Sequence, residues 1–241
     1  METTLDSIRD IRLYQSRTGY RFSIDSLLLY DFVNLKKADY IADLGAGAGI
    51  IGILLAKKYP YSSITLFELQ ENLVKLAERN VLLNKLEDRV RVVKADLTEL
   101  PMPNSSHLAL NIYDLAVSNP PFRMLKSGFM NIEEEKAIAR HEIRLRLHEL
   151  VDAASYLLKA KGRFCLIYHP CRLSYLMDTL NKRELEPKRL RFVHSTISSE
   201  AKMILTEAVK GGKGGLKVDK PLYIYKEDGS YTDEIMNIYN L

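Results

Sequence analysis

The chain has 241 residues, of which 46% are hydrophobic and 27% charged, and its formal net charge is +4. This composition is typical of a globular protein with one large domain, or one domain and a small appendage. No apolar run approaches the ~20 residues of a membrane span, and the N-terminal stretch has acidic residues but no apolar core. We therefore expect neither a membrane segment nor a signal peptide. The two cysteines, Cys165 and Cys171, lack the spacing of metal ligands, which predicts a reduced, cytoplasmic protein without a metal site.

Residues 1–39 precede the regular part of the chain and are expected to form a small N-terminal cap. We expect a hairpin around Thr18–Gly19 and then a helix from about Ile24 to Val33. From residue 40 onward short apolar strands alternate with helical stretches. Residues 40–241 are therefore expected to form the main domain.

The alternating pattern predicts a parallel sheet covered by helices on both faces. Strands are predicted at 40–44, 63–68, 90–94, 112–118 and 163–169, and helices at 50–58, 71–84, about 144–158 and about 173–183. Two further runs, 189–196 and 201–209, follow each other without a helix and predict an antiparallel hairpin at the sheet edge. A glycine-rich turn at 211–215 leads to a last extended run. The fold class is therefore α/β, with a mostly parallel, seven-stranded sheet.

Acid or amide side chains follow each of the first four predicted strands. The first strand ends in DLGAGAG, which begins at Asp43, and the next three are followed by Glu68, Asp96 and Asn119. Because the carboxyl ends of parallel strands meet at one edge of the sheet, these groups are expected to lie together, where ligands bind in such folds.

The glycine-rich segment allows two interpretations as a nucleotide site. Gly47, Gly49 and Gly52 match the GxGxxG fingerprint of dinucleotide-binding proteins, with Glu68 about 20 residues further on. In that fingerprint the first glycine forms the tight turn after the strand, a place that Gly45 already occupies. An acid just before it suits a cation better than a pyrophosphate. The pattern therefore favours S-adenosylmethionine, with Glu68 accepting from the ribose hydroxyls and Asp96 from the adenine amine; packing glycines with incidental acids are the alternative.

The segment VSNPPFRM, residues 117–124, combines an amide, two prolines and an aromatic ring at one strand end. Asn119 offers a side-chain carbonyl, Pro120 offers a backbone carbonyl, and Phe122 offers a flat face. Two acceptors and a stacking platform suit a planar group that bears an NH₂, which is a poor nucleophile until it becomes pyramidal. The prolines hold the turn rigid and remove competing N–H donors. An ordinary turn at a strand end is the alternative.

DLGAGAG and NPPF together resemble the Rossmann-like, class I S-adenosylmethionine-dependent N-methyltransferases over roughly residues 20–210. TGYRFSIDSLLL before the first strand, RHE at 140–142 and EAVKGGKGGLKVDKPLYIY near the C-terminus are similar to the bacterial tRNA1(Val) adenine-N6-methyltransferase family. This resemblance implies methyl transfer to an adenosine beside the anticodon of a tRNA. Cofactor contacts are implied for Ser23, Asp25, Asp43, Gly45, Ala46, Gly47, Glu68, Leu69, Asp96, Leu97 and Asn119.

The resemblance also implies that Asn119, Pro120 and Phe122 hold a flipped adenine, although family members often have tyrosine at position 122. Residues 123–141 are long enough to form a lid over it. RNA contacts are predicted for Pro121, Arg140, His141, Lys210, Lys213 and Lys217. The alternative for the glycine-rich turn is a plain hairpin turn. The alternative for Arg140 and His141 is an ion pair at the start of a helix.

Three alternative functions remain open at this level. The first is a protein methyltransferase acting on glutamine amides, which uses a similar NPP-aromatic motif but has a larger N-terminal domain. The second is amino-methylation of a base in ribosomal RNA or DNA. The third is an RNA-binding module that has kept the fold and lost catalysis. The sequence predicts no oligomeric state.

Overall fold

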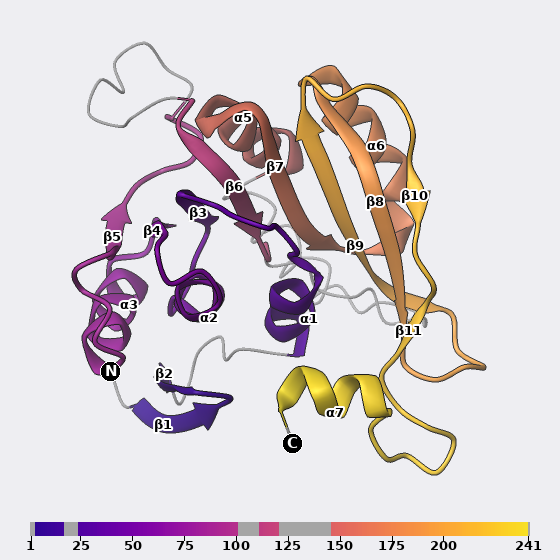
Figure 1. Ribbon diagram of the computed structural model, residues 1–241, viewed down its shortest axis with the longest axis horizontal. Coiled ribbons are helices and arrows are strands. Elements are labelled where there is room, and N and C mark those ends of the chain that lie inside the picture. Colours follow the sequence, from indigo (N-terminus) through magenta and orange to yellow (C-terminus); the bar gives the residue numbers. More distant parts are fainter. Residues whose placement is uncertain (1–2, 17–23, 101–110, 121–145, 241) are drawn as a thin grey trace, which may run out of the picture.

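A computed structural model describes residues 3–16, 24–100, 111–120 and 146–240 (Figure 1). Its centre is one sheet in the order β10-β8-β9-β7-β6-β3-β4-β5, and β11 also pairs with β8. The seven main strands are β3 (Tyr40–Leu44), β4 (Ser63–Glu68), β5 (Val90–Lys94), β6 (Tyr113–Ser118), β7 (Leu158–Tyr168), β8 (Leu185–His194) and β9 (Ala201–Lys210). The short strands β10 (Lys217–Val218) and β11 (Leu222–Tyr223) extend the edge beside β8.

The strand directions confirm the mostly parallel sheet. β3 pairs in parallel with β4 and β6, β4 with β5, and β6 with β7, whereas β9 is antiparallel to both β7 and β8. In Figure 1 the arrows of β6 and β7 accordingly point the opposite way to that of β9. We call the edge where β3, β4, β6 and β7 end the carboxyl rim, and the edge where they begin the amino rim.

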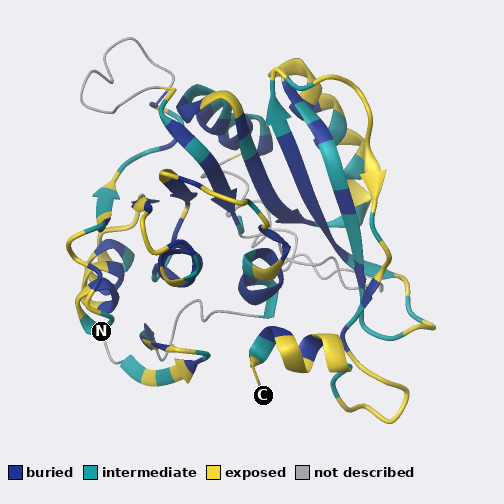
Figure 2. Cartoon of the chain, in the orientation of Figure 1, coloured by how far each residue is buried: buried dark blue, intermediate teal, exposed yellow. Residues whose placement is uncertain are grey.

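Helices cover both faces of this sheet, as the sequence predicts. They are α1 (Ile24–Phe32), α2 (Ile50–Lys58), α3 (Glu71–Leu83), α5 (Leu147–Leu157), α6 (Leu173–Lys182) and α7 (Asp233–Tyr239), with a 3₁₀ turn at Pro170–Arg172. Alternate strand residues face opposite sides: Ile41 packs in the cluster with α1, α2 and α3, and Ala42 packs in the cluster with α5 and α6. The central strands β3, β4, β6, β7 and β9 are consequently buried along most of their length, whereas β5 and β8, toward the two sides of the sheet, are only partly buried (Figure 2).

The N-terminal part forms a hairpin of β1 (Thr3–Ile8) and β2 (Ile11–Ser16) that turns at Arg9–Asp10. The hairpin predicted around Thr18–Gly19 lies outside the described residues. Ile11 of β2 and the leucines of α1 belong to the same apolar cluster as β3 and α2, so the N-terminal part and the sheet share one core.

The predicted bounds differ most at β7. This strand already begins at Leu158, which pairs with Tyr113, and the register then shifts before Leu115 pairs with Arg163. The residues just before Arg163 are mostly polar, so the hydrophobicity pattern does not predict this part of the strand. The pairing of Leu158 with Tyr113 of β6, a tertiary contact, extends the strand to this point.

Candidate active site

The loop after β3 and the start of α2 contain two kinds of glycine: some face open space and others pack against neighbouring side chains. Gly45, Gly47 and Gly49 have φ angles of +72°, +58° and +86°, which side-chain-bearing residues rarely adopt. A Cβ at Gly45 or Gly47 would meet no atom within 4 Å, whereas one at Gly49 or Gly52 would come within 2.9 or 2.1 Å of Leu66. The first two therefore leave room for a ligand to approach the backbone, and the last two let α2 approach β4.

Glu68, at the end of β4, is held in place by this loop. Its side chain is only 6% exposed; Oε2 accepts from the N–H of Gly47 at 2.9 Å and Oε1 from the N–H of Gln70 at 2.8 Å. A carboxylate has about four acceptor positions. Two backbone bonds thus fix the group while each oxygen keeps acceptor capacity, as two ribose hydroxyls require.

Asp43 has a structural contact that the sequence did not predict. It is 1% exposed, and its Oδ2 accepts from the N–H of Gly52, in the first turn of α2, at 2.9 Å. Gly49 precedes this helix without a capping side chain, so Asp43 takes over that role from β3. Burial raises the pKa of Asp43 to about 7; the bond from Gly52 opposes this and the charge of Glu68 adds to it. Its predicted cofactor contact stays a prediction.

The end of β5 presents Asp96 from a tight local turn. Its Oδ1 accepts from both the N–H and the hydroxyl of Thr98, at 2.9 and 2.7 Å. The carboxyl group is half-buried. Of the apolar residues predicted to line the cofactor site, Ala46 and Leu97 are buried and Leu69 is exposed.

Asn119 and Pro120 directly follow β6 and are half-buried. Val117 pairs with Asp43, and the hydroxyl of Ser118 donates to the carbonyl of Leu44 at 2.7 Å, so the ends of β6 and β3 are adjacent. This register brings Asn119 beside the glycine loop, as predicted. The amide Nδ2 of Asn119 donates to Ser26 Oγ on α1 at 3.3 Å.

Two polar residues of the site region were missed by the sequence analysis. Ser26 is buried in α1, and Asn80 is fully buried in α3. The Nδ2 of Asn80 donates to the carbonyls of Ala48, in the glycine loop, and Tyr14, in β2, at 2.9 and 3.0 Å. Asn80 thereby ties the loop to the N-terminal hairpin. A single polar residue on an otherwise apolar helix face was the available signal for both.

Several predicted site residues cannot be placed. Ser23, Pro121, Phe122, Arg140, His141 and the predicted lid lie outside the described residues. Asp25 is described, half-buried in the first turn of α1 next to Ser26.

The three lysines predicted to contact RNA lie away from Asn119. Since β9 is antiparallel to β7, its last residue, Lys210, and the glycine-rich turn after it lie at the amino rim. Lys210 Nζ donates to Asn111 Oδ1 and to the carbonyls of Ser155 and Leu158, at 2.8, 2.5 and 2.8 Å. An ammonium group has three N–H donors, so this geometry favours a structural role for Lys210 and does not support the predicted phosphate contact.

The other two lysines are exposed. Lys213 lies in the glycine-rich turn at the amino rim, whereas Lys217, in β10, pairs with Arg189 in the middle of β8. Lys217 forms an ion pair with Asp219 at 2.7 Å, and the carbonyl of Lys213 accepts from Lys188 Nζ at 2.9 Å. Neither lies with the strand-end residues. The structure therefore separates the predicted RNA-binding lysines from the described residues at the strand ends.

The parallel sheet with one reversed strand and a glycine loop between β3 and α2 define a class I methyltransferase. Residues 21–182 match the family model of the methyltransferase small domain. The chain belongs to this family, and the class predicted from its sequence is confirmed.

Curated relatives and solved structures agree with this assignment. A tRNA1(Val) (adenine(37)-N6)-methyltransferase of Porphyromonas gingivalis is 29% identical over 211 residues, which cover 86% of this chain and 81% of the relative. A protein of the same name from Pedobacter heparinus is 26% identical over 226 residues, with 93% and 92% covered. A predicted O-methyltransferase from Agrobacterium tumefaciens shares the fold with a TM-score of 0.72, at 21% identity and with 90% of this chain and 95% of that chain covered.

S-adenosylmethionine is the methyl donor of this class, and the residues present fit it. The open space over Gly45 and Gly47 and the fixed carboxylate of Glu68 suit a nucleoside with two free hydroxyls. Within the described ranges, no group of three or more His, Cys, Asp and Glu side chains could bind a metal ion. In the same part of the chain, no helix is long and apolar enough to cross a membrane.

Proposed function

We propose that this protein transfers a methyl group from S-adenosylmethionine to the exocyclic N6 amine of an adenosine in tRNA, beside the anticodon. The observation that supports it most is the position of Asn119. This amide follows the strand adjacent to β3, in register with the glycine loop, and therefore faces the methyl group of a cofactor bound there.

The chemistry of an adenine amine explains why acceptors are needed at this position. Its lone pair is delocalised into the ring, so the nitrogen attacks only as it becomes pyramidal. Asn119 Oδ1 and the carbonyl oxygen of Pro120 can accept its two N–H bonds and hold the lone pair in line with the methyl group. Phe122, outside the described residues, is proposed to stack on the base.

The reaction requires no general base before attack, because the neutral amine can attack first and lose a proton afterwards. The bound donor supplies a methyl group on a positive sulfur; the amine nitrogen forms the new C–N bond while the S–C bond breaks. The methylated nitrogen then gives up a proton to water. The two oxygens therefore position the amine and stabilise the positive charge it acquires.

The proposed RNA substrate is supported by the relatives named tRNA1(Val) methyltransferases and by two basic residues at the carboxyl rim. Arg172 lies in the 3₁₀ turn directly after β7, and Lys202 is at the start of β9, which pairs with that end of β7. The pKa of His169, also after β7, is lowered by burial and secondarily by the charge of Lys202. We propose that these cations, rather than the lysines of the amino rim, meet phosphates in a cytoplasmic tRNA.

Incubation with methyl-labelled S-adenosylmethionine and bulk tRNA, followed by nucleoside digestion, tests the proposal. N6-methyladenosine is the expected product. A methylated guanosine would show that the target base is guanine and not adenine. Label that enters ribosomal RNA but not tRNA would show that the substrate is ribosomal RNA. Label found in glutamine of an added protein extract would move the function to the amide methyltransferases.

A further inference from the structure

The side chain of Asn119 can perform its proposed role in only one of two orientations. An amide group is nearly symmetric in shape, but one end is an acceptor oxygen and the other is a donor NH₂. With the oxygen toward the substrate, the amine gains an acceptor. With the NH₂ group there, two donors face each other and the amine loses its bond. Rotation by 180° about one side-chain bond therefore abolishes the proposed contact.

Ser26 marks the end of the amide that points away from the substrate. The Nδ2 of Asn119 donates to its Oγ at 3.3 Å, and Ser26 is 2% exposed. The nitrogen is thereby directed toward α1. Because the amide is planar, Oδ1 then points to the other side of the group. We propose that Ser26 is a positioning residue that selects the productive orientation of Asn119; this inference rests on the proposed function.

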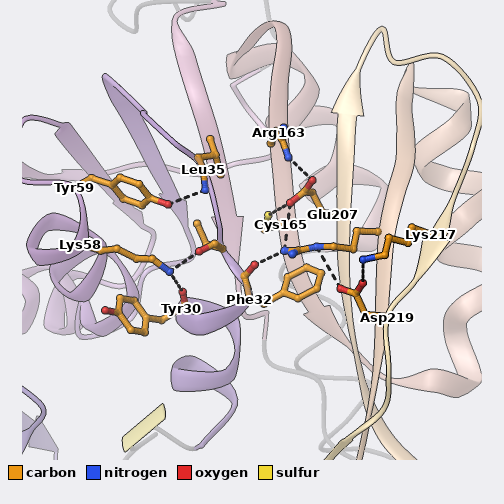
Figure 3. Close-up of polar contacts among 12 residues, drawn as sticks. Tyr30, Phe32, Leu35, Lys58, Tyr59, Arg163, Cys165, Glu207, Lys217 and Asp219 are labelled. Carbon is orange, nitrogen blue, oxygen red and sulfur yellow. Dashed lines mark hydrogen bonds and ion pairs between the residues drawn. The ribbon is translucent and has the colours of Figure 1, made fainter. Parts of the chain in front are cut away.

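The helix that bears Ser26 is clamped at its other end (Figure 3). Lys58 Nζ donates to the carbonyls of Tyr30 and Val33 at 3.1 and 2.5 Å, and Arg189 Nη2 donates to the carbonyl of Phe32. Two cations at a helix C-terminus satisfy carbonyls that have no partner within the helix and interact favourably with its dipole.

Stacking and burial add to this clamp. The Arg189 guanidinium also lies 3.9 Å from the centre of the Phe32 ring. The three leucines that follow Ser26, Leu27, Leu28 and Leu29, are buried in the core. Ser26 is therefore presented to Asn119 by a fixed helix, as a residue that orients another group must be.

A substitution that makes the amide symmetric provides a sharp test. A carboxylate accepts through both oxygens, so Asn119→Asp has no wrong orientation and does not need Ser26. Ser26→Ala should slow methylation of bulk tRNA by about tenfold in the otherwise unaltered protein, the effect of one lost hydrogen bond. In the Asn119→Asp background the same change should alter the rate by less than about twofold, and the affinity for S-adenosylmethionine should hold in both cases.

Ser62→Ala is the matched control, because Ser62 is equally buried and donates to the carbonyl of Ala38 at the amino rim. It should lower the melting temperature about as much as Ser26→Ala and leave the rate unchanged. Equal slowing by Ser26→Ala in both backgrounds would overturn the orienting role, and so would a wild-type rate for Ser26→Ala while Asn119→Ala is slow. If the unaltered protein methylates no amine in tRNA, the proposed function itself fails, which is a different result.

Discussion

The two rims of the sheet use the same residue types for opposite purposes. At the amino rim, charged groups bind protein: Asp114 Oδ2 accepts from the N–H groups of Asp39 and Tyr40 at 2.8 and 2.9 Å, and its Oδ1 pairs with Lys159. Lys210 likewise donates to three protein oxygens. At the carboxyl rim, Glu68 binds backbone N–H groups but keeps acceptor capacity. The charged groups of the amino rim therefore join elements of the fold, whereas Glu68 keeps acceptor positions that we propose a ligand uses.

A cluster of charges in the sequence does not by itself show at which rim those charges lie. Lys210 and the glycine-rich turn are rich in lysine and glycine, which suits a phosphate site, yet they lie at the rim where cations are used for structure. The basic residues proposed to meet RNA, Arg172 and Lys202, belong to no such cluster. Position relative to the rims and local charge density therefore make different predictions for the RNA contact.

The largest effect is expected from Asn119→Ala. Turnover should fall by about 10²–10³, the cost of deleting one preorganised partner of the transition state, while the affinity for S-adenosylmethionine stays nearly intact. Asn119→Asp should be milder because a carboxylate still accepts. Single-turnover methylation and calorimetry measure the two quantities. A wild-type rate for Asn119→Ala would remove this residue from the chemistry.

The next effect concerns pH and has opposite signs at the two rims. Burial raises the pKa of Asp43 to about 7, above the 3.8 of an exposed aspartate, so the folded protein binds more protons than the unfolded chain between these values. Ionised Asp43 therefore destabilises the protein: the free energy of unfolding should fall by about 2–4 kcal/mol as the pH rises through this window. Asp43→Asn should remove that fall. Urea unfolding of both proteins without cofactor, at pH 4 to 7, gives the difference directly.

Asp114 provides the contrast. Burial alone would raise its pKa, but bonds from Lys159 and from the N–H groups of Tyr40 and Asp39 lower it overall. A lowered pKa stabilises the fold above the pKa of the unfolded chain, and this contribution is lost as the pH falls through the folded value. Asp114→Asn should therefore destabilise at neutral pH and not at the acid end. If both variants showed pH dependence of the same sign, the division between the rims would be wrong.

At the carboxyl rim, Glu68→Ala should weaken cofactor binding by about 1.5–3 kcal/mol, since it removes a charged acceptor of two hydroxyl bonds. It also releases the N–H groups of Gly47 and Gln70, so the glycine loop should lose order. Glu68→Gln keeps one acceptor oxygen, so its affinity for S-adenosylmethionine should lie between those of Glu68→Ala and the unaltered protein. Calorimetry with S-adenosylmethionine measures both, and unchanged affinity would exclude Glu68 from the cofactor site.

At the amino rim, Lys210→Met should lower the free energy of unfolding by about 1–3 kcal/mol, because it leaves three protein acceptors without their common donor. Neither cofactor affinity nor turnover should change. Chemical denaturation and calorimetry on the same preparation test this. A loss of tRNA affinity with unchanged stability would restore the phosphate contact that the sequence suggested.

Much of the fold, and the position of the residues at the strand ends, could be predicted because they depend on local pattern and strand direction. The bounds of β3, α2 and β4 follow from apolar runs and glycines, and the sheet rule then places Glu68 and Asn119 at one edge. The contact of Ser26 with Asn119 could not be predicted, because it spans 93 positions of sequence and depends on how α1 packs. The three protein contacts of Lys210 could not be predicted either, because its environment depends on the reversed direction of β9.

The smallest effect, and the one that tests the comparison most directly, is the salt dependence of tRNA binding. Two double variants each remove two positive charges: Arg172→Gln with Lys202→Gln at the carboxyl rim, and Lys213→Gln with Lys217→Gln in and just after the glycine-rich turn, which we call the turn pair. Long-range attraction changes equally in both, so a difference reports direct phosphate contact. The carboxyl-rim pair should flatten the slope of log affinity against log salt by about 1–2, and the turn pair should leave it nearly unchanged. Filter binding of bulk tRNA over a series of salt concentrations provides the slopes. If the turn pair flattens the slope more, the RNA contacts the glycine-rich turn.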